Sequence, residues 1–420
     1  MIQHVFYYVL KQNRNTLICS EPIPTRFNKM FRGHSFLFLL FITIGNSCWA
    51  QSKIEKNENL EKPIQFVKTK IASESYESVG VLDVNNDKIP DIVSGAFWYE
   101  GPDYLDRHFI NSPGRYGEYW DDFSTIPFDV NGDGLMDIIT GGWFGKSLVW
   151  KENPGSESEW QEHQIAKTGN IETTRAWDID GDGILEIVPN TPNDSLVIYR
   201  LVKEEQGKGF GKFDAHRIAE KNGHGLGFGD INGDGRGDLI IHNGWLEAPE
   251  KPFKDAWDFH PDFDFGTASI PILVVDVNKD GLNDVIVGQA HGYGLDWYEQ
   301  KVDERTMRRG WIKHPIDPYN SQFHTMEWVD LDGDGDAELV TGKRYRAHNG
   351  KDPGGKDLVG IYYYKWNGES FTKQVISYGA FGDGKGIGIY FDVHDLNGSG
   401  RKDIIVAGKD GLYVFYNIPL

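Results

Sequence analysis

Two kinds of side chain in this sequence are placed so that they could do chemistry: regularly spaced acids and a few irregularly placed histidines. Residues 323–350, FHTMEWVDLDGDGDAELVTGKRYRAHNG, contain both kinds. In the central DLDGDGDAE, oxygen-bearing side chains alternate with other residues, which is typical of a loop that binds a hard cation such as calcium. His324 and His348 lie near the ends of the segment, and imidazole can bind a transition metal or transfer a proton.

The cation-loop pattern occurs seven times, with first residues at positions 83, 129, 178, 230, 276, 330 and 395. Each copy has oxygen-bearing side chains at positions 1, 3 and 5 and a carboxylate at position 9. The EF-hand is excluded, because no copy has a glutamate at position 12 and each copy runs into strand-type residues. Seven copies of one loop predict a repeated fold that is stapled by calcium.

Two copies depart from the pattern, and we expect these two to bind calcium most weakly. Lys88 replaces the turn glycine in the first loop, and Ser399 replaces the acid at position 5 of the seventh. The predicted calcium ligands are Asp83, Asn85, Asp87, Asp91, Asp129, Asn131, Asp133, Asp137, Asp178, Asp180, Asp182, Glu186, Asp230, Asn232, Asp234, Asp238, Asp276, Asn278, Asp280, Asp284, Asp330, Asp332, Asp334, Glu338, Asp395, Asn397 and Asp403.

The spacing of the loops predicts the fold that positions these residues. Successive loops begin 46 to 65 residues apart, which fits a blade of four short strands. Seven such units predict an all-β, seven-bladed β-propeller over residues 64–420. After the last loop the chain has two strand-like stretches, so we expect residues 64–72 to supply the missing strand and close the ring.

Strand direction predicts which residues share a face of the propeller. Neighbouring strands of a blade run in opposite directions, so the cation loops lie on one face. The starts of the innermost strands and the turns between second and third strands lie on the other. The residues six positions before each loop mark this second face; they are Glu77, Phe123, Glu172, His224, Ile270, His324 and Ile389.

Histidines and carboxylates on this second face predict a transition-metal site. We expect Glu172, His224 and His324 to bind a borderline divalent metal, zinc or manganese. His291 and His348 lie in second turns and are expected beside them, His291 as a further candidate ligand.

The same second turns supply groups that suit a sugar. Trp143 and Trp245 offer apolar ring faces, while Lys343 and Arg344 can donate hydrogen bonds to hydroxyl groups. The alternative for the tryptophans is packing within a blade.

Most of the other histidines are expected to be structural. Four of them recur in the outermost strands and are predicted to pack there: His108, His163, His216 and His314. His242, His260 and His394 have no companion at a matching position of another blade.

Charge and the N-terminal segment limit the partners and the location of the protein. A formal net charge of −20 argues against nucleic acid, because binding phosphate backbones requires clustered Lys and Arg. A basic residue, an apolar run over 36–44 and Ala50 follow the order of a secretory signal peptide, and the run is too short to span a membrane. We predict an upstream extension and signal peptide over 1–50, a linker over 51–63, and export to the periplasm or the medium. A lipid anchor on Cys48 is the less favoured alternative, and the sequence leaves the oligomeric state open.

The loops resemble FG-GAP or VCBS repeats, and this resemblance covers residues 64–420. Blades four to seven also resemble the propeller domain of aldos-2-ulose dehydratase, which dehydrates keto-sugars such as 1,5-anhydrofructose. The segments that carry the second resemblance are GHGLGFGDINGDGRGDLI, GQAHGYGLDWYEQ, SQFHTMEWVDLDGDGDAELVTGKRYRAHNGKDPG and YFDVHDLNGSGRKDIIVAG.

The second resemblance implies a carbon–oxygen lyase or hydratase that acts on a keto-sugar or keto-glycoside. A metal would polarise the ketone, and protein groups would move the protons of the elimination. His348 and Tyr345 would transfer protons, with His291 and Lys343 as further catalytic groups.

Two other classes of function stay open at this stage. A non-catalytic propeller could hold a glycan or a protein on the same face; its histidines would be replaceable and its only metal would be calcium. A polysaccharide lyase would need a long open groove, of which the sequence gives no sign.

Overall fold

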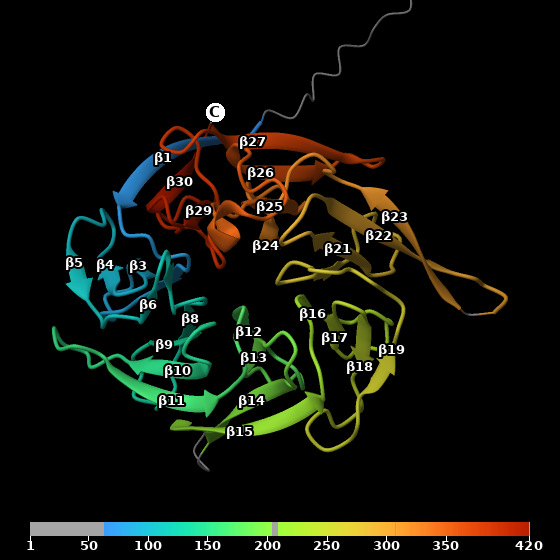
Figure 1. The fold of residues 1–420 in the computed structure, drawn as a ribbon, viewed down its shortest axis with the longest axis horizontal. Helices are drawn as coiled ribbons and strands as arrows, with labels where there is room; N and C mark the ends of the chain where they lie inside the picture. Colours follow the sequence, from blue (N-terminus) through green and yellow to red (C-terminus); the bar gives the residue numbers. More distant parts are fainter. Residues whose placement is uncertain (1–62, 204–208, 307, 420) are drawn as a thin grey trace, which may run out of the picture. The chain divides into compact units, whose positions relative to one another are not determined.

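Seven four-stranded antiparallel sheets stand around a central axis in the computed structural model (Figure 1). The structure describes residues 63–203, 209–306 and 308–419, and residues 61–420 form one compact unit. The predicted all-β, seven-bladed β-propeller is therefore confirmed. The predicted extension and signal peptide over 1–50, and nearly all of the linker over 51–63, lie outside the described residues. Within the described residues, no helix has the length and hydrophobicity needed to cross a membrane.

The blades follow one another along the chain, each from its innermost to its outermost strand. Their strands are β2 (Gly80–Leu82), β3 (Asp91–Ser94), β4 (Phe97–Tyr99) and β5 (Arg107–Phe109); β8 (Ile126–Phe128), β9 (Asp137–Gly141), β10 (Ser147–Glu152) and β11 (Gln161–Lys167); β12 (Thr173–Trp177), β13 (Glu186–Asn190), β14 (Leu196–Lys203) and β15 (Gly209–Ala219); β16 (Leu226–Gly229), β17 (Asp238–Ile241), β18 (Gly244–Glu247) and β19 (Asp258–His260); β20 (Leu273–Val275), β21 (Asp284–Gly288), β22 (Leu295–Val302) and β23 (Arg309–Pro315); β24 (Phe323–Val329), β25 (Glu338–Lys343), β26 (Val359–Trp366) and β27 (Phe371–Gly379); and β28 (Asp392–His394), β29 (Asp403–Val406), β30 (Leu412–Ile418) and β1 (Gln65–Ala72).

The seventh sheet combines the two ends of the propeller. β1 pairs antiparallel with β30, from Gln65 opposite Ile418 to Ala72 opposite Leu412. This pairing covers the edge that β30 would otherwise expose. Two small elements lie outside the blades: the hairpin of β6 (Arg115–Tyr116) and β7 (Tyr119–Trp120), and the short 3-10 segment η1 (Ala347–Gly350).

The strand sequences explain where the core lies. The second strand of every blade is buried along its whole length, which accounts for the runs DIIT, DVIVG and DIIV. Isoleucine and valine suit this position, because branched side chains pack well on a pleated surface. Outer strands such as β11 and β23 are largely exposed instead.

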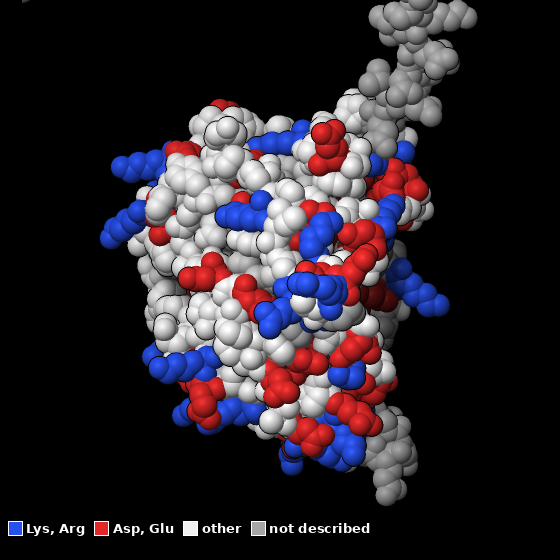
Figure 2. Space-filling model, turned by 90° about the vertical axis from the view of Figure 1, so that its right-hand side faces the viewer, with Lys and Arg blue, Asp and Glu red and all other residues white. Residues whose placement is uncertain are grey.

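On the side of the molecule drawn in Figure 2, basic side chains are interspersed with acidic ones rather than gathered into a patch.

A tryptophan and a histidine stack between the two outer strands of four blades. The pairs are Trp98–His108, Trp150–His163, Trp245–His260 and Trp297–His314, with ring centroids 4.0 to 4.5 Å apart. Packing in the outer strand is thus the role of three of the predicted histidines. His216 packs on Phe253 instead. The prediction that His260 has no companion was wrong, because β19 sets it directly opposite Trp245.

This stack also corrects the prediction for Trp245. Its side chain is 1% exposed, and its indole N–H donates to Asp262 Oδ2 at 3.0 Å. A ring with both faces in the blade core cannot stack on a sugar, so Trp245 is a packing residue.

The carboxylate at position 9 of every cation loop is fully buried. In five loops one oxygen accepts the backbone N–H of loop position 2, and the other accepts a backbone N–H at the third strand. For Asp137 these donors are Val130, at 2.9 Å, and Asn153, at 2.8 Å. The carboxylate therefore ties the loop to the blade even without a cation.

Replacing Asp137 by Asn tests this tie. An amide has only one acceptor oxygen, so one of the two buried N–H groups loses its partner, and we expect a loss of about 1–3 kcal/mol in unfolding free energy. The measurement is denaturant unfolding in the presence of a chelator. Asp133→Asn, at the exposed position 5 of the same loop, is the control and should change little; an equal loss in both variants would contradict the assignment.

A second prediction concerns pH and follows from the burial of these acids. Burial raises the pKa of Asp91, Asp238 and Asp284 to about 6 and that of Asp137, Glu186 and Glu338 to about 7. In the unfolded chain such groups ionise near pH 4, so the folded state binds more protons between these values. Ion-free protein should therefore lose stability as pH rises from about 4 to about 7.

Melting temperatures in chelator across this range provide the test. Calcium favours the ionised carboxylates, so the increase in melting temperature that it causes should grow from pH 5 to pH 7.5. A melting temperature in chelator that climbs steadily over this range would contradict the prediction.

Candidate functional site

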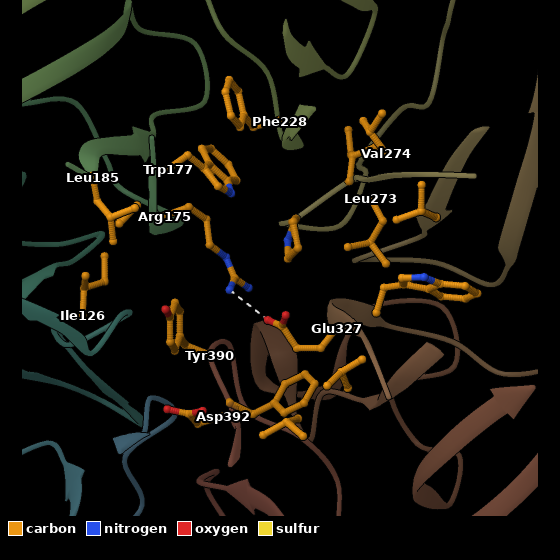
Figure 3. Close-up of a pocket in the computed structure, with 18 of the residues that line it drawn as sticks. Ile126, Arg175, Trp177, Leu185, Phe228, Leu273, Val274, Glu327, Tyr390 and Asp392 are labelled. Carbon is orange, nitrogen blue, oxygen red and sulfur yellow. Dashed lines mark hydrogen bonds and ion pairs between the residues drawn. The ribbon is translucent and has the colours of Figure 1, made fainter. Parts of the chain in front are cut away.

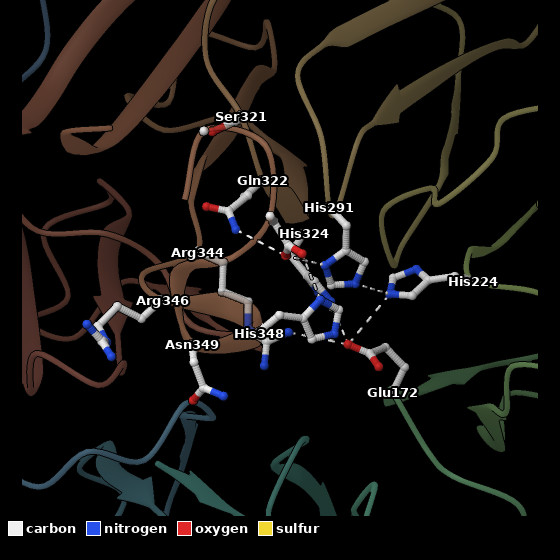
Figure 4. A network of polar contacts seen from close by, with 12 residues as sticks. Glu172, His224, His291, Ser321, Gln322, His324, Arg344, Arg346, His348 and Asn349 are labelled. Carbon is white, nitrogen blue, oxygen red and sulfur yellow. Dashed lines mark hydrogen bonds and ion pairs between the residues drawn. The ribbon is translucent and has the colours of Figure 1, made fainter. Parts of the chain in front are cut away.

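Four side chains from four blades meet at the end of the axis opposite the cation loops. Glu172 directly precedes β12, and His224 lies two residues before β16. His291 lies in the turn after β21, and His324 lies in β24. Figure 4 shows the four pointing toward one another. One ligand-type atom of each lies within 4.8 Å of all the others. The structure thus brings together the three predicted ligands and places His291, predicted chiefly as catalytic, among them.

The Glu172 carboxylate is the acceptor at the centre of this group. Its Oε1 lies 2.8 Å from Nε2 of His324, 3.5 Å from Nε2 of His224 and 3.3 Å from Nη1 of Arg344. Glu172 is 5% exposed and His324 is 0% exposed. Nδ1 of His324 has no hydrogen-bond partner among the described residues.

His224 and His291 face each other with ring nitrogens. Their Nε2 atoms are 2.9 Å apart. Nδ1 of His224 lies 2.8 Å from the Ala268 carbonyl oxygen, and Nδ1 of His291 lies 3.0 Å from Asp352 Oδ2. A carbonyl oxygen and an ionised carboxylate can only accept, so we assign the proton of each ring to Nδ1. Both Nε2 atoms then present lone pairs to each other.

Two facing lone pairs repel unless a cation lies between them. A second proton on His291 is disfavoured, because burial and neighbouring positive charge lower the pKa of His291 to about 4. Burial likewise holds the pKa of His324 well below its usual value. Neutral imidazole is the form that binds metal ions, and Nδ1–H groups held by a carbonyl and a carboxylate are typical of metal-binding histidines.

His348 forms the solvent side of the group. Its ring stacks on His291, with centroids 4.4 Å apart and planes 19° apart, and its side chain is 58% exposed. Nδ1 of His348 lies 2.8 Å from Asp352 Oδ1, so Asp352 orients both rings. This leaves Nε2 of His348 free to take a proton from a bound molecule.

A buried ion network supports the group from the side. Arg344 Nε donates to Glu77 Oε1 at 3.0 Å, and Lys409 Nζ lies 3.5 Å from Glu77 Oε2. Although burial opposes the charge, Glu77 and Glu172 raise the pKa of Arg344. The predicted contact of Arg344 with substrate is corrected, because its side chain is 3% exposed and occupied by these two acids.

Lys343 also has a different role from the predicted one. It is 2% exposed, and its ammonium group donates to the Gly354 carbonyl oxygen at 2.6 Å and to Ser321 Oγ at 3.1 Å. Burial lowers its pKa to about 8. Lys343 therefore holds the segment after η1 in place.

The remaining predicted residues lie farther from the four ligand atoms. The Tyr345 ring stacks on Phe381, with centroids 5.3 Å apart. Trp143 is half-buried, and its carbonyl oxygen accepts from Asn170 Nδ2 at 2.7 Å. Within the described part of the chain, neither side chain hydrogen-bonds to or stacks on the four clustered side chains.

Sequence reasoning missed two features of the site. Asp352, which joins His291 to His348, was signalled only by its place four residues after His348. The β6–β7 hairpin lies beside η1, where the Asn349 backbone N–H donates to Tyr119 Oη at 3.3 Å. Tyr116 on this hairpin stacks on Phe144 at 4.5 Å, so a partly exposed aromatic ring lies on the hairpin beside η1.

A separate cavity of about 520 Å³ opens at the other end of the inner strands (Figure 3). Its walls combine apolar residues such as Trp177 and Phe228 with the charged Arg175, Glu327 and Asp392. Arg175 pairs with Glu327 at 3.3 Å and donates to Thr325 Oγ1 at 2.6 Å. Thr325 directly follows His324, so this buried layer separates the cavity from the histidines.

Comparison with known proteins supports the fold. Residues 129–188 and 253–341 match the FG-GAP-like repeat family, so the chain contains FG-GAP-like repeats. A comparison with curated proteins found no match. BBS1N, in its crystal structure with ARL6DN, is 10% identical with a TM-score of 0.50, covering 85% of this chain and 97% of that chain. The exotype rhamnogalacturonan lyase YesX is 14% identical with a TM-score of 0.48, covering 85% and 75%. The likeness to BBS1N concerns the fold alone, and nothing is inferred from the likeness to YesX.

The protonation of His291 can be measured directly. Nitrogen-15 NMR of chelator-treated protein should show His291 protonated at Nδ1, which faces Asp352, and unprotonated at Nε2 near neutral pH. His291 should gain its second proton only as the pH falls to about 4. A proton on Nε2 of His291 at neutral pH, or a His291 titration near pH 6.5, would contradict the assignment.

Proposed function

We propose that this protein is a metal-dependent lyase or hydratase that eliminates water or a glycosyl group from a keto-sugar or keto-glycoside. The observation that carries the proposal is the 2.9 Å contact between Nε2 of His224 and Nε2 of His291, beside the Glu172 carboxylate. Three imidazoles and one carboxylate suit zinc or manganese, whereas calcium prefers oxygen ligands alone. His224, His291 and Glu172 would hold this ion, with His324 as the fourth ligand.

The ion would act as a Lewis acid that polarises the ketone and acidifies the neighbouring C–H bond. His348 is placed to take that proton at its exposed Nε2, and Asp352 stabilises the imidazolium that forms. The electron pair of the C–H bond forms the new C=C bond while the β C–O bond breaks. His348 then returns the proton to the departing oxygen, so an enone and water or an alcohol leave the site.

Aromatic rings beside His348 support a sugar as the substrate. Tyr116 is 45% exposed and stacks on Phe144, on the face that carries His348. Such rings suit the apolar faces of a pyranose. In this proposal His348 takes over the proton transfer that was also expected of Tyr345.

Two further parts of the proposal concern the loops and the location. Calcium in the repeat loops would staple the blades, because each loop brings carboxylate and amide oxygens together at the spacing of a hard-cation site. Export is proposed from the signal-peptide pattern, in a mature chain whose sequence after residue 48 contains no cysteine.

A second candidate function is a non-catalytic propeller that binds a glycan or a protein. The observation in its favour is that Arg344 already forms ion pairs with both Glu77 and Glu172. A buried network of this kind could close the axis without any metal.

Elemental analysis of the purified protein separates the two candidates. We expect about one zinc or manganese per chain beside calcium, and its loss in His224→Ala and His291→Ala. The control is His216→Ala, in the outer strand, which should keep the metal. Calcium as the only metal, together with no ultraviolet-absorbing product from any keto-sugar, would leave the binding module as the function.

His348→Ala tests the proton-transfer step on its own. The variant should keep its metal and lose about 10²- to 10⁴-fold in kcat, because only the general base is removed. Full elimination activity in this variant would remove His348 from the mechanism.

A further inference from the structure

One position on the third strand of each blade faces the cation loop of that blade. In every blade the residue at loop position 10 lies in the second strand and pairs with a residue of the third strand. The residue directly after that partner therefore occupies an equivalent position in all seven blades. In chain order they are Glu100, Glu152, Arg200, Glu247, Glu299, Lys365 and Tyr416. Four of these residues are glutamates, two are basic and one is a tyrosine, so the charge of this residue differs between loops that share one pattern.

The sign of this residue follows the composition of its loop. The four loops that face a glutamate, starting at 83, 129, 230 and 276, have Asn at position 3 and Asp at position 9. The two loops that face a basic residue, starting at 178 and 330, have Asp at position 3 and Glu at position 9. An extra carboxylate therefore occurs in each loop that has a positive side chain opposite.

Arg200 lies among the predicted ligands of the third loop. Its Nη2 is 2.9 Å from Asp180 Oδ2 and 2.6 Å from Asp182 Oδ2, while its Nε is 3.4 Å from Glu186 Oε1. These acids occupy positions 3, 5 and 9, so the guanidinium contacts three of the four predicted ligands.

Lys365 lies in the sixth loop in the same way. Its Nζ is 2.6 Å from Asp334 Oδ2 and 3.3 Å from Glu338 Oε1, which belong to positions 5 and 9. The third and sixth loops are also the two loops in which three carboxylates lie within 4.8 Å of one another. Three carboxyl groups this close are stabilised by a neighbouring positive charge, and here the chain itself supplies one.

The glutamate at position 9 has one carboxylate oxygen left for an ion pair with the basic side chain. Glu186 and Glu338 each accept one backbone N–H through Oε2, from Ile179 and Leu331. Their Oε1 atoms are buried without a hydrogen bond and face the basic side chains instead. The aspartates of the other five loops use both oxygens on backbone N–H groups, as Asp137 does.

We propose that Arg200 and Lys365 take the place of the metal ion in the third and sixth loops, so that calcium binds only in the other loops. A divalent ion would have to share its carboxylates with a fixed positive charge, and the two cations would repel each other. The inference rests on the proposed calcium in the repeat loops. It also departs from the expectation that all seven loops bind calcium, with the first and seventh the weakest, because the third and sixth loops become the ones that take none.

The third and sixth loops follow the inner strands that position two members of the candidate metal site. Glu172 directly precedes β12, which leads into the third loop, and His324 lies in β24, which leads into the sixth. The two most buried members of that site therefore stand on inner strands whose loops are stapled without calcium. Their positions would be maintained when external calcium falls.

Calcium binding to chelator-stripped protein, measured by titration calorimetry with calcium chloride, tests the inference at matched positions. Asp133→Asn, at position 5 of the second loop, should remove one calcium per chain. Asp182→Asn and Asp334→Asn, at position 5 of the third and sixth loops, should leave the number of bound calcium ions unchanged. A loss of one calcium in Asp182→Asn or Asp334→Asn would overturn the proposal.

Removing the built-in cations provides the opposite test. Arg200→Gln and Lys365→Gln should each add one calcium per chain, and the control Arg217→Gln, on the exposed side of β15, should add none. Melting of each variant with and without calcium verifies folding and should show a calcium-dependent stabilisation that exceeds that of the wild type. No added calcium in either variant would overturn the proposal, whereas a wild type that binds no calcium would overturn the loop-calcium proposal itself.

Discussion

One close contact supports the proposed metal site: the Nε2 atoms of His224 and His291 lie 2.9 Å apart at the end of the propeller axis. The outer nitrogens of both rings are engaged by pure acceptors, so the inner ones carry lone pairs. A shared proton or a metal ion between the rings makes the contact favourable. The proposed function takes the metal ion, with the nearby Glu172 carboxylate as a further ligand and His348 on the exposed side.

The same need to compensate buried charge recurs throughout the molecule. The position-9 carboxylates are satisfied by backbone N–H groups, Glu77 and Glu172 by Arg344, and the acids of two loops by Arg200 and Lys365. Arg200 and Lys365 stand in β14 and β26, and Arg344 directly follows β25. A β-propeller suits such pairing, because every inner strand begins and ends at an equivalent height around one axis.

Much of this architecture could be predicted from sequence, because loop spacing reports blade length and strand alternation reports the face. The gathering of Glu172, His224, His291 and His324 follows from those two rules alone. Side-chain direction could not be predicted in this way. Trp245, Lys343 and Arg344 lie in or beside the expected turns, yet each points into the protein. The alternation of Glu with Arg or Lys opposite the loops was visible in the sequence, but only the strand registers show that these positions are equivalent.

X-ray absorption spectroscopy of the purified protein at the zinc and manganese edges would identify the proposed metal and its ligands. We expect a zinc or manganese centre with at least two imidazole ligands and a carboxylate oxygen, at about 2.0–2.2 Å for zinc. Replacement of His224 or His291 should remove imidazole scattering from the spectrum. A protein whose only metal is calcium, with oxygen ligands at about 2.3–2.6 Å, would contradict this expectation.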